Sequence, residues 1–164
     1  MLRKLIHTPG EPTLTLIRFV LGVVFFAHGA QKVLGWFGGP GFAGTMHFFT
    51  HGVGVPPFFA VLAILAEFLG GIGLILGFLT RIAAFGIAVD MAVAVALVHA
   101  PNGFFMNWSG NQAGEGFEFH LLAIAMALAV MVRGAGAFSL DRVWEQSLVY
   151  PRQHMPPHPA PLRP

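Results

Sequence analysis

The sequence contains no cysteine and very little charge. The missing cysteine excludes structural disulfides, thiolate metal ligands, iron–sulfur clusters and thiol chemistry by the chain itself. Charged residues make up 10% of the 164 residues, against about a quarter in soluble domains. The net charge of +2 does not indicate nucleic acid as a partner. Because 55% of the residues are hydrophobic, the chain has too little polar surface to dissolve as a monomer, and we expect an integral membrane protein.

Four apolar stretches are suited to cross a bilayer as helices, which takes about 20 residues each. They cover residues 13–34, 57–79, 81–100 and 117–132. No stretch alternates strictly between apolar and polar residues, so a membrane β-barrel is excluded. The sequence therefore predicts an all-α integral membrane protein, a four-transmembrane-helix bundle with two outer loops rich in aromatic residues and glycine. The second and third spans join almost directly, which predicts a tight antiparallel hairpin.

Basic residues are unevenly distributed, and this predicts the orientation. Lysine and arginine precede the first span, separate the second from the third and follow the fourth, but both long connections lack them. By the positive-inside rule, both termini face the cytoplasm across the plasma (bacterial inner) membrane. We expect a cytoplasmic segment at 1–12, a transmembrane domain at 13–143 and a cytoplasmic proline-rich tail at 144–164. Arg18 and His28 interrupt the first apolar run, which favours a retained span over a cleaved signal peptide.

The two outer connections are unusually apolar for loops. Bulky aromatics stand among glycines at Trp36 and Phe37 in the first, and at Phe104, Phe105 and Trp108 in the second. Mobile, solvated loops would be polar. Two interpretations are open: the rings anchor the loops in the membrane interface, or the loops form a lid over a cavity.

Ionisable residues inside the apolar spans are costly and usually face the bundle interior. From the helical rise, Glu67 and Asp90 each fall about 15 Å from a membrane face, near the midplane. If they face each other, repulsion between the carboxylates favours a shared proton. If they face apart, each needs its own donor or cation, and Arg18 is the candidate cation for one of them.

A second group of polar residues lies toward the outer side. His28, Lys32, His99 and either Glu118 or His120 fall within about 6 Å of one another in depth. They predict a polar pocket under the outer loops for a small neutral or anionic ligand. Lys32 supplies the charge there and His28 a proton, while aromatic rings form a flat wall. A bis-histidine haem or a histidine–carboxylate metal site is disfavoured, because isolated histidines usually make structural hydrogen bonds.

Several short segments occur in an order and spacing typical of one family. They are residues 18–22, 28–32, 67–71, 77–81 and 134–141, together with the glycine–phenylalanine loop. In these segments, from about Leu16 to Asp141, the chain resembles the DoxX family of small four-helix membrane proteins. The resemblance implies a bundle in the plasma membrane that acts as an oxidoreductase or redox-associated subunit. One branch, DoxD, is linked to thiosulfate:quinone oxidoreduction, and some members are associated with a superoxide dismutase and a sulfurtransferase.

Our leading hypothesis is a subunit that couples an oxidoreductase to the membrane quinone pool; whether it is catalytic alone stays open. The candidate residues are His28 and Glu67 for proton transfer, and Arg18, Lys32, Asp90, His99 and His120 for ligand binding, with Arg18 holding a carboxylate. Quinone is the cofactor under consideration, haem is disfavoured, and no metal site is expected. Expected partners are the lipid bilayer, a redox enzyme and a second copy of the chain. The alternatives are a non-enzymatic scaffold or assembly factor of an envelope redox complex, and a proton-coupled small-solute transporter.

Overall fold

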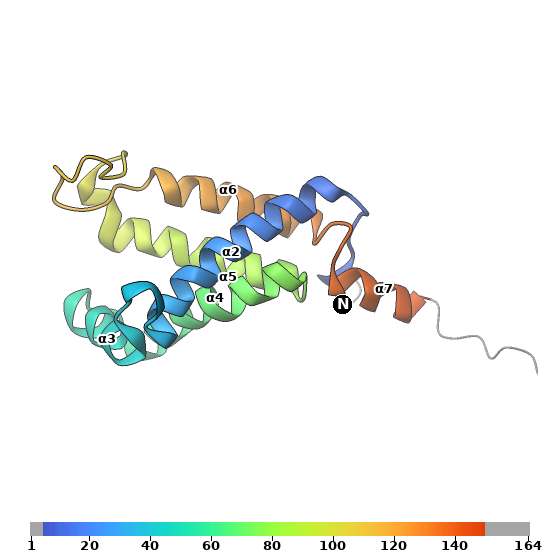
Figure 1. Cartoon of the computed structure of the whole chain (residues 1–164), viewed down its shortest axis with the longest axis horizontal. Coiled ribbons are helices and arrows are strands. Elements are labelled where there is room, and N and C mark those ends of the chain that lie inside the picture. Colours follow the sequence, from blue (N-terminus) through green and yellow to red (C-terminus); the bar gives the residue numbers. More distant parts are fainter. Residues whose placement is uncertain (1–4, 150–164) are drawn as a thin grey trace, which may run out of the picture.

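The computed structural model describes residues 5–149, and every regular element in that range is helical. Four antiparallel helices form the body of the molecule (Figure 1). They are α2 (Pro12–Leu34), α4 (Pro57–Leu76), α5 (Thr80–Ala94) and α6 (Glu118–Arg133). A π turn (η3, Val95–His99) and a 3-10 turn (η4, Ala100–Asn102) extend α5. The predicted all-α membrane bundle is confirmed.

Three of the helices are long and apolar enough to cross a membrane. These are Pro12–Leu34, Pro57–Leu76 and Thr80–Asn102. The fourth expected span corresponds to α6, which has 16 residues and is therefore about 24 Å long. That length falls short of a hydrocarbon core of about 30 Å.

Proline and glycine set the ends of the first two long helices. Both α2 and α4 begin with proline, whose fixed φ angle suits the first helical turn. The predicted second span reaches residue 79, but α4 ends at Leu76, because Gly77 takes a left-handed conformation with φ 67°. Leu79 has φ 47° just before α5 begins. The predicted tight hairpin therefore turns over three residues.

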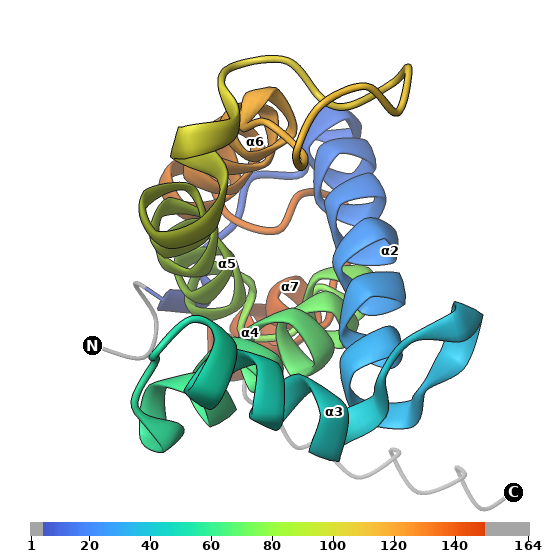
Figure 2. The same cartoon turned by 90° about the vertical axis from the view of Figure 1, so that its left-hand side faces the viewer.

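The four helices form a closed ring in which α2 contacts α4 and α6, and α5 contacts the same two helices (Figure 2). Glycines allow α2 and α4 to cross very closely. A Cβ atom on Gly29 would lie 2.9 Å from the carbonyl carbon of Glu67, and one on Gly71 would lie 2.7 Å from the Cα of Phe26. Small residues at such crossings let the backbones of membrane helices touch. This contact sets the height of the polar residues on α2 against those on α4.

The two ends of the bundle are built differently (Figure 1). We call one the loop end; it carries residues 35–56, which include α3 (Gly41–His47), and residues 103–117. We call the other the terminal end; it carries residues 5–11 and 134–149. Helix α7 (Leu140–Val149) lies at the terminal end and crosses the expected boundary between residues 143 and 144. The expected proline-rich tail from residue 150 lies outside the described residues.

Candidate functional site

Arg18 lies at the terminal end, where its side chain is 1% exposed. Nε donates to the carbonyl of Ala135 at 2.8 Å, and Nη2 donates to that of Phe138 at 2.5 Å. Nη1 donates to the carbonyls of Leu74 and Ile75, in the last turn of α4. Carbonyls in a last helical turn lack partners within the helix. Arg18 was expected to hold a carboxylate of the ligand site; the structure places it on backbone carbonyls instead.

Asp141 caps the opposite side of the same hairpin. Its side chain is 1% exposed, and its two oxygens accept the backbone N–H groups of Leu79 at 2.8 Å and Thr80 at 2.9 Å. These donors stand at the first turn of α5, so Asp141 acts as an N-cap supplied from a distant segment. Its own N–H donates to the carbonyl of Gly77 at 2.8 Å. Residues 77–81 and 134–141, two of the segments that carry the family resemblance, therefore bind each other.

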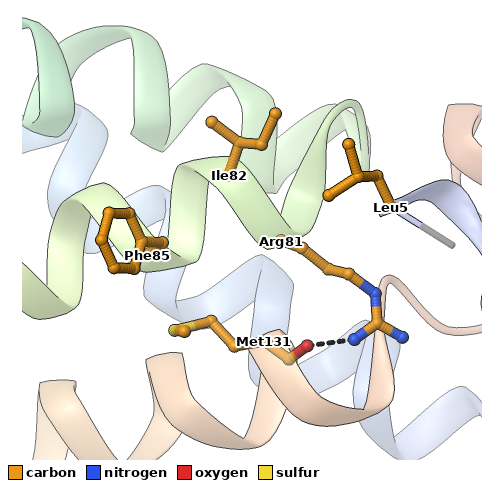
Figure 3. A pocket seen from close by; sticks show the side chains of 5 residues that line it. All are labelled: Leu5, Arg81, Ile82, Phe85 and Met131. Carbon is orange, nitrogen blue, oxygen red and sulfur yellow. Dashed lines mark hydrogen bonds between the residues drawn. The ribbon is translucent and has the colours of Figure 1, made fainter. Parts of the chain in front are cut away.

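Arg81 donates to carbonyls in the last turn of α6, as Arg18 does in the last turn of α4 (Figure 3). Its Nη1 donates to the carbonyls of Met131 and Val132, and its Nη2 donates to that of His7 at 3.1 Å. An apolar groove of about 280 Å³ lies beside it, lined also by Leu5, Ile82 and Phe85. Arg18, Asp141 and Arg81 at the terminal end thus bind backbone groups.

Nearer the loop end, three ionisable side chains from three helices meet. Lys32 Nζ on α2 lies 2.5 Å from Glu67 Oε2 on α4. The Glu67 side chain is 7% exposed and that of Lys32 21%. The carboxyl group of Asp90 on α5 lies within hydrogen-bonding reach of the Glu67 carboxyl. Of the two arrangements that the sequence left open for Glu67 and Asp90, the structure shows the facing one.

A pocket of about 250 Å³ opens beside this row of charges. Its polar lining combines five of the predicted site residues with a loop glutamate, and its apolar lining consists of aromatic rings and methionines. The lining residues are His28, Lys32, Glu67, His99, Glu115, His120, Phe25, Met91, Met106 and Phe119. Asp90 is not among them. The pocket therefore contains five of the seven predicted site residues, with Asp90 adjacent and Arg18 at the far end.

Two histidines from different helical segments contact each other in the pocket, with their ring planes tilted by 42°. The ring centroids of His99 and His120 lie 4.0 Å apart, a contact that leaves no room for a porphyrin between the rings. His99 Nδ1 lies 2.8 Å from the carbonyl oxygen of Glu115, which only accepts, so this nitrogen carries the hydrogen. His120 is 6% exposed, and its Nδ1 has no hydrogen-bond partner among residues 5–149. A buried nitrogen without a partner indicates room for a ligand or water.

The π turn at Val95–His99 brings His99 to the pocket. In a regular helix, each residue advances by about 100°, so His99 would point away from Asp90. A π turn inserts one extra residue, which moves His99 back by about one such step and aligns it with Met91, another lining residue. No residue pattern in the sequence indicated this π turn.

The second outer connection covers the pocket. Glu118 Oε1 accepts the backbone N–H of Met106 at 2.9 Å and the indole N–H of Trp108 at 3.0 Å. Met106 and Glu115 line the pocket, whereas Trp108 is 85% exposed. This loop therefore forms a lid over the pocket and also directs one aromatic ring, Trp108, outward. The sequence left open whether Glu118 or His120 belongs to the pocket. Glu118 binds the loop, and His120 lines the pocket.

Sequence reasoning missed five lining residues: Phe25, Met91, Met106, Glu115 and Phe119. Methionines and a glutamate in a glycine-rich loop carry no spacing signal of their own, so only the ring of helices brings them together. In the described part of the chain, no three histidine, aspartate or glutamate side chains converge as metal ligands would.

Comparison with known proteins decides the family. A family model described as DoxX matches residues 13–100, more than half of the chain. The chain belongs to the DoxX family. The match contains α2, α4 and α5 with Lys32, Glu67 and Asp90, and it stops before α6 and His120. The resemblance drawn from the sequence is thereby confirmed.

Two of the relatives of this DoxX protein are named as membrane proteins, and a third as an oxidoreductase. It is 32% identical over 150 residues to "Uncharacterized membrane protein Rv3486" of Mycobacterium tuberculosis, covering 85% of each chain. It is 33% identical to "Inner membrane protein YqjF" of Escherichia coli, covering 77% of this chain and 87% of the other. It is 28% identical to "Putative oxidoreductase CatD" of Bacillus subtilis, covering 77% of this chain and 82% of the other. No solved structure matches the chain significantly.

Proposed function

We propose that this DoxX protein is a redox-associated membrane subunit that binds a quinone head group in the loop-end pocket and couples an oxidoreductase to the membrane quinone pool. The observation that carries the proposal is the pocket itself, with its neutralised ion pair, unpartnered histidine nitrogen and aromatic wall. The name of the Bacillus subtilis relative supports redox chemistry.

The charge of the pocket favours a neutral ligand over an anion. Lys32 already binds Glu67 at 2.5 Å, and Glu115 adds a further carboxylate to the lining. A free anion would therefore compete with carboxylates for the same ammonium group. A quinone carries no charge, and its carbonyl oxygens accept the remaining N–H groups of Lys32 or those of His28 and His120.

The shape of the pocket suits a flat ring. Phe25 and Phe119 stand with their ring centroids 6.3 Å apart and 28° between their planes, and His28 lies 6.0 Å from Phe119. Aromatic groups stack favourably on such surfaces. The volume of about 250 Å³ is just below the range of about 300–1,000 Å³ typical of drug-sized ligands. It therefore fits a head group better than a larger cofactor.

The proposed placement in the membrane follows the charges at the terminal end. Arg81, Arg133 and Arg142 lie there, which supports a cytoplasmic terminal end in the bacterial inner membrane. We include α6 as the fourth span because it runs antiparallel to α5 within the ring, and tilting or local thinning of the bilayer accommodates a short helix. The proposed transmembrane domain remains 13–143, flanked by cytoplasmic segments.

Photolabelling with a quinone tests the pocket. The full chain, in nanodiscs, is illuminated with an azido-substituted ubiquinone analogue, and the labelled peptides are mapped by mass spectrometry. We expect label on peptides containing Met106 or Phe119, removed by excess unlabelled decylubiquinone. His28→Ala should lower this labelling, whereas the matched control His47→Ala should not, because His47 lies outside the pocket lining. Label confined to lipid-facing peptides, or insensitive to competitor, overturns quinone binding.

Co-purification tests the coupling. A tagged chain extracted in mild detergent should bring down an oxidoreductase in a fixed stoichiometry. An oxidoreductase partner without pocket labelling would support the scaffold or assembly-factor alternative instead. If neither a partner nor labelling of the pocket is found, and a proton gradient drives uptake of a solute into liposomes, the transporter alternative is supported.

A further inference from the structure

The row Lys32–Glu67–Asp90 has a property that ligand binding does not explain. Two carboxyl groups and one ammonium group are held together by α2, α4 and α5, with Glu67 almost fully buried. With both carboxyls ionised, the row would carry one uncompensated negative charge inside an apolar bundle. Such a charge is expensive in a membrane protein. One bound proton makes the row neutral.

The contact between the two carboxyl groups points the same way. Glu67 Oε2 accepts from Lys32, and Asp90 faces Glu67 one helical turn from the point where Gly70 of α4 packs on Ile87 of α5. Two ionised carboxylates that face each other in an apolar bundle repel, and a proton on one of them removes the repulsion and lets that group donate to the other. We propose that Glu67 and Asp90 hold one exchangeable proton between them, and that the row Lys32–Glu67–Asp90 is a proton-binding site.

The other ionisable groups near the row do not supply a second fixed cation. His28 approaches it from α2, and His99 and His120 approach from η3 and α6 on the pocket side, together with Glu115 from the loop. Arg18 binds carbonyls at the terminal end. Lys32 therefore stands against two carboxyl groups in the row, and a proton completes the balance.

The position of the row gives the proton a route to the pocket. Glu67 touches Asp90 on one side and lines the pocket on the other, whereas Asp90 does not line it. The second step of the proposal is that a ligand in the pocket exchanges this one proton through Glu67, after which the row takes up a proton again. This second step rests on the proposed function; the proton-binding site itself does not.

Infrared spectroscopy of the ligand-free protein tests the site. The full chain in nanodiscs at neutral pH should show the carbonyl stretch of a protonated carboxylic acid, with an amplitude of one group per chain and a shift in D2O. We expect this band to be lost in Asp90→Asn and in Glu67→Gln, because the remaining carboxyl then ionises and pairs with Lys32. Glu115→Gln is the matched control and should keep the band, since Glu115 is exposed.

Folding and function are separated by further measurements. Circular dichroism reports the helix content of each variant, and if Asp90→Asn does not fold, Asp90→Glu decides. A band retained at a shifted frequency in Asp90→Glu supports the site, and an unshifted band overturns it. Absence of the band in the natural chain, or its persistence in folded Asp90→Asn, also overturns it. Because the sample contains no quinone, this result is independent of the photolabelling. The proton-binding site can therefore fail while quinone binding stands, and the reverse.

Discussion

The two ends of this DoxX bundle use the same kinds of residue in opposite ways. At the terminal end, Arg18, Arg81 and Asp141 bind backbone groups at helix ends. At the loop end, His28 and Lys32 face a cavity. The difference shows that a charged residue inside an apolar segment is not by itself a functional signal. The two cases differ in whether backbone groups bind the hydrogen-bonding atoms of the charged side chain.

The reason for the difference lies in how the helices are joined. At the terminal end, the last carbonyls of α4 and α6 have no partners within their own helices and need donors from elsewhere. Arginines from the neighbouring helices α2 and α5 provide them. At the loop end, residues 103–117 cover the bundle and satisfy their own polar groups through Glu118. Below this loop, Nδ1 of His120 has no hydrogen-bond partner among residues 5–149 and is available to a ligand.

Removing Arg18 should have the largest effect on stability. In Arg18→Met, carbonyls of four residues lose a buried donor, and an unsatisfied buried group costs about 1–3 kcal/mol. We expect the free energy of unfolding, measured by SDS titration, to fall by at least about 4 kcal/mol on that basis. Quinone labelling of any folded fraction should be unchanged, because Arg18 lies outside the pocket lining.

Arg133→Met is the matched control for Arg18. Arg133 lies at the same end but makes an exposed ion pair with Glu11, with side-chain exposures of 56% and 46%. Exposed ion pairs contribute about 0–1 kcal/mol, so this variant should stay near the natural chain. Equal losses in both variants would contradict the distinction between buried capping and surface pairing.

The helical bundle, its hairpin and the depth of its charges could be predicted from the sequence. Length and apolar composition identify the helices, and the rise per residue places Glu67 and Asp90 at matching heights. The partner of Arg18 could not be predicted in this way, because a backbone carbonyl at a helix end has no residue type to reveal it. A carboxylate partner was therefore expected where the structure has carbonyls.

The direction of a side chain around its helix is harder to predict than its depth. His99 reaches the pocket through a π turn, a backbone irregularity without a recognisable residue signature here. Whether Glu67 and Asp90 face each other depends on how α4 and α5 are rotated, which tertiary packing decides. Sequence reasoning missed five lining residues because they come together through the same kind of long-range arrangement: Phe25, Met91, Met106, Glu115 and Phe119.

Removing Lys32 should have the next largest effect and should act on both stability and the pocket. Lys32→Met leaves Glu67 without its cation, and breaking a buried ion pair from one side costs about 3 kcal/mol or more. We expect the double variant Lys32→Met/Glu67→Gln to recover most of the lost unfolding free energy in SDS titrations. Quinone labelling should stay low in both variants. A double variant as unstable as the single one would contradict the pairing.

The close crossing of α2 and α4 should respond more moderately. Gly71→Ala places a methyl group against the backbone of Phe26, and such overpacking costs about 1–3 kcal/mol. Gly70→Ala is the control on the same helix, because its Cβ would meet Ile87 at an ordinary 3.6 Å. Alanine is the better helix former, so Gly70→Ala should be neutral or stabilising. A similar loss of unfolding free energy in both variants would show that the crossing is looser than the structure has it.

The smallest expected effect belongs to the lid. Glu118→Gln keeps an acceptor for Met106 and Trp108 but removes the charge that strengthens both hydrogen bonds, a loss of about 1 kcal/mol. Amide hydrogen exchange in residues 103–117 should then be about fivefold faster, since exchange of such loops follows their local opening. Exchange in residues 35–56 of the same sample is the internal control, because Glu118 makes its hydrogen bonds to the other loop. Unchanged exchange over residues 103–117 would mean that the lid is held by its ring contacts, such as Phe104 against Phe117 at 5.5 Å, and not by Glu118.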